Sequence, residues 1–294
     1  MKQLKREIAP HLVHLINSII RTQIFPTFYK ISRISPLSKP NKDDKDIANY
    51  RPINNLPTIE KIIETHILTY LIPFFNDNKI INKFHHGGRE KHSTTTALSN
   101  ITYTLNKNYE NNLISAVIST DLTAAFDTVD TDILLSKLKY YGIQGNEFKL
   151  LENYMSNRQQ FVQVDTFNSK IITAPRCSVF QGSKMSGLLY SIYVNEVTLI
   201  HKLLNKNFYN NQNLYNLTTN DKITSFKGNI EHLTYNFVDD STSIISFTNP
   251  IDIKTYLTKY FKLLQAFYTI NKLQINSDKT QLMLSHTPKF NNIL

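Results

Sequence analysis

Two adjacent acidic residues, Asp239 and Asp240, interrupt the hydrophobic segment NFVDDSTSI. Aspartate is a poor strand residue, and two like charges side by side repel each other unless a positive group lies between them. A divalent cation would supply that positive charge. Pairs of aspartates are also common in turns for reasons of turn chemistry alone. The pair by itself therefore favours a turn over a metal site.

A third carboxylate, Asp121, follows the apolar segment LISAVIST and is itself followed closely by Phe126 and Asp127. If the two apolar segments are neighbouring strands, three carboxylates converge at one end of a sheet. Carboxylate oxygens in such a set could hold two Mg²⁺ ions about 4 Å apart, which is the arrangement used in two-metal phosphoryl transfer. The sequence thus contains a candidate metal site that depends on the pairing of two strands.

The elements that would position these residues alternate between helical and extended patterns. Apolar residues at helical spacing predict helices over residues 7–21, 57–75, 93–109, 130–140, 146–155 and 251–271, and a mostly helical stretch over 181–204. Short apolar or alternating runs predict strands over 113–122, 160–164, 169–173 and 274–285, and two strands joined by a turn within 234–247. Two further extended segments flank a charged loop at 39–46, and the Asn-rich stretch 205–229 is predicted to be a loop insertion.

Composition limits the class of protein. The chain has 294 residues, of which 41% are hydrophobic and 11% aromatic, so a large buried core is available and disorder throughout is excluded. The 33 Lys and Arg residues exceed the 23 Asp and Glu residues and give a net charge of +10. That balance favours a polyanionic partner, nucleic acid first and an acidic membrane second, although many intracellular proteins are basic without such a partner.

The expected compartment is intracellular. The single cysteine, Cys177, cannot form an intrachain disulfide or a zinc site built on several cysteines, and it fits a reducing environment. The start of the chain lacks the layout of a signal peptide, and the longest apolar runs are too short to cross a bilayer. We therefore expect a soluble protein that is not secreted, is nuclear or cytoplasmic, and has no membrane partner.

Other patterns with chemical potential are weaker. His85 and His86 are adjacent, and neighbouring side chains rarely bind one ion together, so metal ligation is the less favoured interpretation. Ser93 and its threonine neighbours are better explained as a helix cap than as a nucleophile. The sequence has no phosphate-binding loop of the Gly-x4-Gly-Lys type, no His-Glu-x2-His motif and no Gly-x-Ser-x-Gly elbow.

Six sequence blocks occur in an order that is typical of one family. They are IFPTFYKISRISPLSKP with NYRPINNLPTIEKIIE, HHGGREKHSTTTAL, STDLTAAFDTVD, VFQGSKMSGLLYSIYVNEV, NFVDDSTSI and NKLQINSDKTQLML. In this order they resemble the paired fingers motifs, the block that follows them, and motifs A, B, C and D of the reverse transcriptase domain of non-LTR (LINE-type) retrotransposons. The resemblance covers nearly the whole chain, and a chance match of six ordered blocks is negligible.

The resemblance implies a catalytic role for four residues of motifs A, C and D. Asp121, Asp239 and Asp240 would be the metal-binding carboxylates, and two Mg²⁺ ions, or Mn²⁺ in their place, would be the cofactors. Lys279 would be a general acid that protonates the departing pyrophosphate. A surface lysine without a catalytic role remains the alternative for Lys279.

The resemblance also implies a nucleotide-binding set. Lys39 and Arg51 would contact the triphosphate, and Gln181 and Gly182 would help to bind the incoming nucleotide and the template base. Phe126 would be a steric gate whose ring leaves no room for a 2′-OH group, so that deoxynucleotides are selected. An ordinary core phenylalanine and a solvated loop lysine remain the alternatives for Phe126 and Lys39.

The implied fold is α+β, a right-hand polymerase with fingers and a palm whose antiparallel sheet packs on helices. The expected organisation is an N-terminal helix and fingers over 1–113, a palm segment with motif A over 114–132, a connection between fingers and palm over 133–178, and the palm with motifs B, C and D over 179–294. Few residues follow motif D and few precede the first block. We therefore expect no thumb, and missing endonuclease and thumb segments.

The function that these observations favour is an RNA-directed DNA polymerase of a retrotransposon-like element. It would use an RNA template and a DNA primer, and add dNTPs to the primer 3′-OH by two-metal phosphoryl transfer. Two alternatives stay open: a catalytically inactive retroelement fragment that acts at most as a nucleic-acid-binding module, and a related polymerase such as a group II intron-type enzyme. Intact Asp121, Asp239 and Asp240 favour the enzyme, and the missing thumb favours the inactive fragment.

Overall fold

The computed structural model describes residues 2–40, 43, 45–176, 179–204 and 228–290, and Cys177 and most of the predicted loop insertion lie outside the described residues. The chain divides into two compact units, each built from two separate stretches. Unit 1 comprises Met1–Ile80 and Phe126–Ile192, and unit 2 comprises Ile81–Ala125 and Tyr193–Leu294. None of the helices within the described residues is long and apolar enough to span a membrane.

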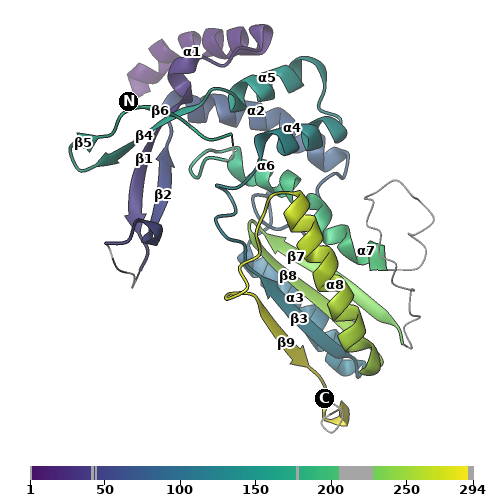
Figure 1. Ribbon diagram of the computed structural model, residues 1–294. Coiled ribbons are helices and arrows are strands. Elements are labelled where there is room, and N and C mark those ends of the chain that lie inside the picture. The colour runs from purple at the N-terminus through teal and green to yellow at the C-terminus, as the bar shows by residue number, and fades with distance from the viewer. Residues whose placement is uncertain (1, 41–42, 44, 177–178, 205–227, 291–294) are drawn as a thin grey trace. The chain divides into compact units, whose positions relative to one another are not determined.

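Unit 1 combines a small sheet with helices (Figure 1). Its helices are α1 (Lys2–Thr22), η1 (Thr27–Lys30), η2 (Ile47–Asn49), α2 (Thr58–Asp77), α4 (Thr131–Tyr140), α5 (Gly145–Met155) and α6 (Ser186–Tyr193, whose last residue falls in unit 2). Its strands are β1 (Ile31–Ser38), β2 (Tyr50–Asn55), β4 (Gln159–Val164), β5 (Phe167–Asn168) and β6 (Ile172–Thr173). Strand β1 is antiparallel to β2 and parallel to β4, and β5 and β6 both pair with β4.

Hydrophobic spacing explains the helices of unit 1. In α2 the side chains of Ile63, Ile67 and Leu71 recur every fourth residue and are buried on one face. Helix α4 begins where the Asp130 side chain accepts hydrogen bonds from the amides of Asp132 and Ile133 at 3.0 and 2.9 Å. The helices predicted over 57–75, 130–140 and 146–155 are confirmed, as are the extended segments that flank residues 39–46.

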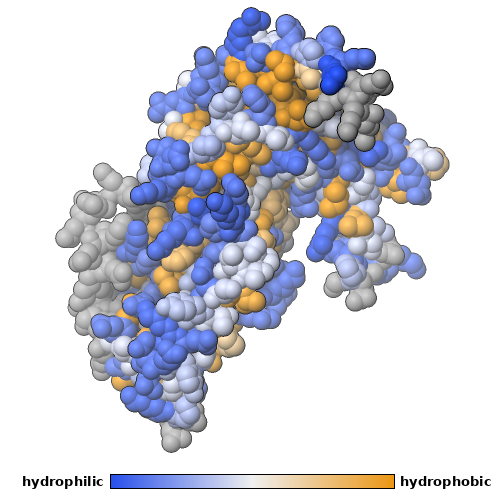
Figure 2. Space-filling view, turned by 180° about the vertical axis from the view of Figure 1, so that it is seen from behind, coloured by the Kyte–Doolittle hydropathy of each residue, from blue (hydrophilic) through white to orange (hydrophobic). Residues whose placement is uncertain are grey.

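Apolar side chains also reach the surface of unit 1. Figure 2 shows them gathered over the part of this unit that contains α1, where Ile8, Val13 and Ile20 are exposed. A groove of about 360 Å³ is lined by α1, α2 and α5, with Ile67 and Leu150 among its residues. The apolar face of α1 is therefore only partly covered within the described residues.

Unit 2 is a four-stranded antiparallel sheet of order β7-β8-β3-β9 with helices on both faces (Figure 1). Its strands are β3 (Ile114–Thr120), β7 (Ile230–Phe237), β8 (Asp240–Phe247) and β9 (Gln281–Ser285). Its helices are α3 (Thr94–Glu110), η3 (Asn195–Leu199), α7 (Ile200–Leu204), α8 (Ile251–Ile270) and η5 (Pro288–Phe290). The strand that precedes Asp121 is therefore the second strand from one edge of the sheet.

Polar contacts identify the face that each long helix covers. Asn108 of α3 donates a hydrogen bond to the hydroxyl of Ser246 at 2.7 Å, and Tyr260 of α8 is bonded to the hydroxyl of Ser243 at 2.7 Å. Residues an odd number of positions apart on a strand point to opposite faces of the sheet. Helices α3 and α8 therefore cover opposite faces, and the helices predicted over 93–109 and 251–271 are confirmed.

Three predicted elements differ from the structure. The predicted strand over 169–173 is a strand only at Ile172–Thr173, which is β6. The stretch over 181–204 is helical only from Ser186, because residues 181–185 form turns that are held by contacts outside the helix. The predicted strand over 274–285 is a strand only over Gln281–Ser285. The segment before it turns instead, since the amides of Lys279 and Thr280 donate to the Asn276 carbonyl.

Candidate active site

The two adjacent aspartates lie at the end of the β7–β8 hairpin. The strands pair as far as Phe237 and Asp240, so the turn consists of Val238 and Asp239, and Asp240 is the first residue of β8. Asp239 is half-buried and Asp240 is exposed. Val238 has a φ angle of 59°, a left-handed conformation that a β-branched residue rarely adopts. Contacts around the turn must therefore hold this backbone in place.

The register of the sheet brings the third aspartate to the same end. Thr120, the last residue of β3, pairs with Ser241 of β8, so Asp121 follows directly at the end of the sheet where Asp240 begins β8. The condition set by the sequence, that the two segments be neighbouring strands, is met. Within the part of the chain that is described, however, no three Asp, Glu, His or Cys side chains are grouped closely enough to hold a metal ion. The structure brings the three residues to one end of the sheet, and their role as ligands stays a prediction.

Asp121 retains an oxygen that could accept a ligand. Its Oδ2 atom is buried without a hydrogen-bond partner and lies 3.5 Å from Nζ of Lys279, whose side chain is 68% exposed. The segment that carries Lys279 is held beside Asp121 because the amide of Asn276 donates to the Asp121 carbonyl at 2.9 Å. A buried carboxylate oxygen with no hydrogen bond fits a divalent cation, because such ions prefer oxygen ligands.

A segment that sequence reasoning missed supports the turn. The amide of His86 donates to the Asn236 carbonyl at 2.7 Å, and the amide of Asn236 donates to the Phe84 carbonyl at 3.0 Å. The His85 ring is bonded to the Asn236 amide group at 3.0 Å, and burial lowers the pKa of His85 to about 3, so the ring stays neutral. A Cβ atom on Gly87 would lie 2.3 Å from the backbone nitrogen of Val238. The paired glycines in HHGGREKHSTTTAL were the sequence signal for this close approach.

Lys39 and Arg51 lie on the β1–β2 hairpin of unit 1. Arg51 is exposed and pairs with Leu37, and the amide of Lys39 donates to the Asn49 carbonyl at 2.8 Å. If the alternation of the strand continues to Lys39, the two basic side chains lie on the same face of the hairpin. The structure therefore places both residues on one hairpin, and their contact with a triphosphate stays a prediction.

Phe126 belongs to unit 1 and is half-buried. Its ring stacks on the fully buried ring of Tyr190, with 4.8 Å between the centroids and an interplanar angle of 28°. The amide of Val179 donates to its carbonyl at 3.0 Å. The ring is therefore supported on one side and keeps an exposed part, which a steric gate requires.

Gln181 and Gly182 form a loop that lies against β2 within unit 1. The Gln181 carbonyl accepts a hydrogen bond from the amide of Asn54 at 2.9 Å. The Gln181 side chain reaches Asp127 at 3.5 Å, and burial raises the pKa of Asp127. Gly182 has a φ angle of 123°, and a Cβ atom there would lie 2.2 Å from the Asn54 carbonyl oxygen. Gly182 is therefore required because its backbone lies close against β2.

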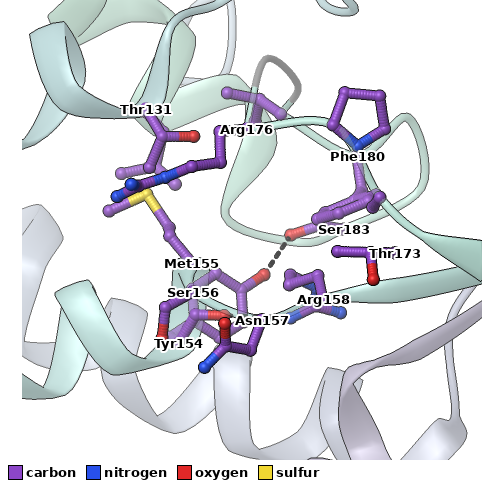
Figure 3. A pocket seen from close by; sticks show the side chains of 14 residues that line it. Thr131, Tyr154, Met155, Ser156, Asn157, Arg158, Thr173, Arg176, Phe180 and Ser183 are labelled. Carbon is purple, nitrogen blue, oxygen red and sulfur yellow. Dashed lines mark hydrogen bonds between the residues drawn. The ribbon is translucent and has the colours of Figure 1, made fainter.

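A cavity of about 250 Å³ adjoins this loop (Figure 3). Tyr154, Arg158, Phe180 and Ser183 are among the residues that line it. The Arg158 guanidinium lies 4.5 Å from the centroid of the Phe180 ring and 5.0 Å from that of Tyr154, so the cation is held between two aromatic faces. The loop is therefore backed by ordered side chains.

Comparison with known proteins decides the family. The family described as "Reverse transcriptase (RNA-dependent DNA polymerase)" matches residues 39–291. The chain belongs to the reverse transcriptase family. The resemblance predicted from the six sequence blocks is confirmed.

Relatives of this chain are named as polymerases of mobile elements. The "Probable RNA-directed DNA polymerase from transposon BS" of Drosophila melanogaster is 29% identical over 203 residues, which are 67% of this chain and 22% of that protein. The "RNA-directed DNA polymerase from mobile element jockey" of Drosophila funebris is 30% identical over 189 residues, which are 64% of this chain and 20% of that protein. The chain thus spans about a fifth of the length of these relatives.

Solved structures of the same fold include telomerases. Apo telomerase from Candida tropicalis, truncated from its C-terminal domain, has 13% sequence identity and a TM-score of 0.55, and the match covers 90% of this chain and 52% of that one. The predicted α+β class is confirmed, and the fold is consistent with that of a polymerase.

Proposed function

We propose that this reverse transcriptase copies an RNA template by adding dNTPs to the 3′-OH group of a DNA primer. The observation that carries the proposal is the register of β3, β7 and β8, which brings Asp121 to the end of the sheet where Asp240 begins β8 and where the turn contains Asp239. The net charge of +10 suits the two nucleic-acid strands that such an enzyme must bind. An intracellular setting, nuclear or cytoplasmic, follows as part of the same proposal.

In this proposal Asp121, Asp239 and Asp240 hold two divalent cations, Mg²⁺ or Mn²⁺. When bound, these ions would supply positive charge at the attacking and leaving oxygens. The buried Oδ2 atom of Asp121, which has no hydrogen bond, supports its assignment as a ligand. Lys279, whose Nζ lies 3.5 Å from that oxygen, donates a proton to the departing pyrophosphate.

The residues of unit 1 bind the nucleotide in this proposal. Lys39 and Arg51 neutralise the triphosphate with fixed positive charge. Gln181 and Gly182 contact the nucleotide and the template base, and Phe126 lies under the sugar. The β1–β2 hairpin then belongs to the fingers, and the sheet of unit 2 to the palm.

Primer extension tests the proposed function. Purified protein is given an RNA template with an annealed DNA primer, Mg²⁺ and dNTPs, beside a double variant that carries Asp239→Asn and Asp240→Asn. Synthesis by the unmodified chain alone is the expected result. If neither protein extends the primer and both still bind RNA, the alternative of an inactive nucleic-acid-binding fragment is the better description.

Replacement of Phe126 tests sugar selection. Phe126→Ala removes the ring that stacks on Tyr190 and opens space beneath the sugar, so the ratio of kcat/KM for rNTPs to that for dNTPs should rise about tenfold or more, equivalent to ~1.4 kcal/mol. The measurement is single-nucleotide incorporation with matched rNTP and dNTP. Phe167→Ala, at an exposed position of β5, is the control and should leave the ratio unchanged. An unchanged ratio in Phe126→Ala would favour the alternative that Phe126 is an ordinary core phenylalanine.

A further inference from the structure

Two buried glutamates lie one turn apart on α2, where the sequence resemblance assigned no role. Glu60 and Glu64 are both fully buried. A carboxylate removed from water is strongly destabilising unless its oxygens are paired. Glu60 is paired with Arg158, whose guanidinium lies 2.5 Å away, and burial raises the pKa of Glu60 to about 7. The groups that pair with Glu64 therefore indicate which part of the fold its carboxyl group holds.

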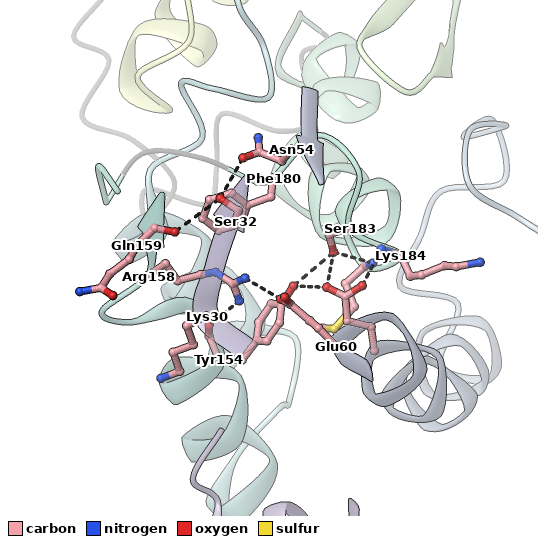
Figure 4. Close-up of polar contacts among 12 residues, drawn as sticks. Lys30, Ser32, Asn54, Glu60, Tyr154, Arg158, Gln159, Phe180, Ser183 and Lys184 are labelled. Atoms are coloured by element: carbon pink, nitrogen blue, oxygen red, sulfur yellow. Dashed lines mark hydrogen bonds and ion pairs between the residues drawn. The ribbon is translucent and has the colours of Figure 1, made fainter. Parts of the chain in front are cut away.

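Glu64 is bonded to the loop that follows Gly182, and its three partners, Tyr154, Ser183 and Lys184, are labelled in Figure 4. Its Oε1 atom accepts hydrogen bonds from the hydroxyls of Tyr154 at 2.5 Å and Ser183 at 2.7 Å. Its Oε2 atom accepts a hydrogen bond from the backbone amide of Lys184 at 2.8 Å. These hydrogen bonds are shielded from water because Glu64 and Tyr154 are buried. Both oxygens of Glu64 are thus engaged, and two of the three donors belong to the loop.

The loop depends on such contacts for its conformation. Residues 181–185 are neither helix nor strand, and only Met185 among them is apolar. On one side the amide of Asn54 is bonded to the Gln181 carbonyl, and the Gly182 backbone packs on β2. On the other side Glu64 holds the next two residues. The loop is therefore fixed between a strand and a buried carboxylate.

We propose that Glu64 is a positioning residue that holds the loop over 181–184 in the conformation that binds the incoming nucleotide. This inference rests on the proposed function, because it assumes that Gln181 contacts the nucleotide. A residue that acted only by filling space in α2 would need no acceptor atoms. An apolar side chain of similar length would leave the Lys184 amide without its acceptor and would remove the acceptor that the Tyr154 and Ser183 hydroxyls share, so the loop would lose its attachment to α2.

The test measures loop stability and nucleotide affinity in the full chain. Glu64→Met keeps the volume and removes both acceptors. Glu64→Gln keeps one acceptor and serves as the conservative rescue. Glu60→Gln is the matched control, since Glu60 is equally buried on the same helix and is bonded to Arg158. Hydrogen exchange is followed in peptides that contain the Lys184 amide, and KM for dNTP and kcat are measured by single-nucleotide incorporation.

In Glu64→Met we expect exchange at the Lys184 amide and KM for dNTP each to rise tenfold or more, with kcat within threefold of the unmodified chain. For Glu64→Gln, the exchange rate and KM should lie between those of the unmodified chain and those of Glu64→Met. Glu60→Gln should keep both quantities within threefold of the unmodified chain, even if its unfolding temperature falls. Unchanged exchange in Glu64→Met, or equal effects in Glu60→Gln, would overturn the proposal. If the unmodified chain makes no DNA, the proposed function fails, and the exchange measurement alone decides whether Glu64 holds the loop.

Discussion

Asp239→Asn is expected to reduce the rate of primer extension about 10³-fold or more, which corresponds to the loss of about 4 kcal/mol of transition-state stabilisation. The amide keeps the size of the carboxylate and removes the charge that a divalent cation needs. Asp239 is half-buried in a two-residue turn, so little packing is lost, and the free energy of unfolding should change by no more than about 0.5 kcal/mol. Single-turnover extension and thermal unfolding measure the two quantities.

A matched control distinguishes the loss of a charge at the proposed metal site from the loss of a charge elsewhere on the surface. Asp165→Asn makes the same chemical change in the exposed turn between β4 and β5, where φ is 50° and asparagine is tolerated as well as aspartate. This variant should extend primers at the unmodified rate. Wild-type rates in Asp239→Asn would refute the assignment of this residue as a metal ligand, and unfolding of the variant would show that the turn depends on its charge.

Gly87→Ala should lower the rate of extension about 10²-fold, because a displacement of about 1 Å at a reacting group costs roughly that much. The new Cβ would lie 2.3 Å from the backbone nitrogen and 2.6 Å from Cγ2 of Val238, and neither distance is possible without movement. Val238 already adopts a left-handed backbone, so the turn has little room to adjust. The displaced residue is the one next to Asp239. Overpacking of this kind should also cost about 1–3 kcal/mol of stability.

Gly145→Ala is the control for the added methyl group. Gly145 has a φ angle of 60°, which strains any side chain, yet its Cβ would meet nothing closer than 3.6 Å. We expect this variant to lose some stability and to keep the rate of extension. A Gly87→Ala variant with the rate of the unmodified chain would show that residues 84–88 do not hold the turn in its active position.

The family and the α+β class could be predicted because six sequence blocks resemble one family in their order, and most of the elements could be predicted because they depend on residues that are close along the chain. Apolar residues four apart in α2, the Asp130 side chain that caps α4 and the apolar run before Asp121 each determine their local structure. The motif order supplied the candidate carboxylates. That these carboxylates meet at one end of a sheet could be predicted only on the condition that the two apolar segments are neighbouring strands.

Only the tertiary structure decided which segments meet. The pairing of β3 with β8 brings Asp121 to the end of the sheet where Asp240 begins β8, and the turn before β9 puts Lys279 beside Asp121. Residues 84–87 lie against the β7–β8 turn from about 150 positions away, a contact that helical or strand periodicity cannot encode. The predicted helical stretch over 181–204 is wrong for residues 181–185, where only Met185 is apolar and hydrogen bonds to Asn54 and Glu64 hold a loop.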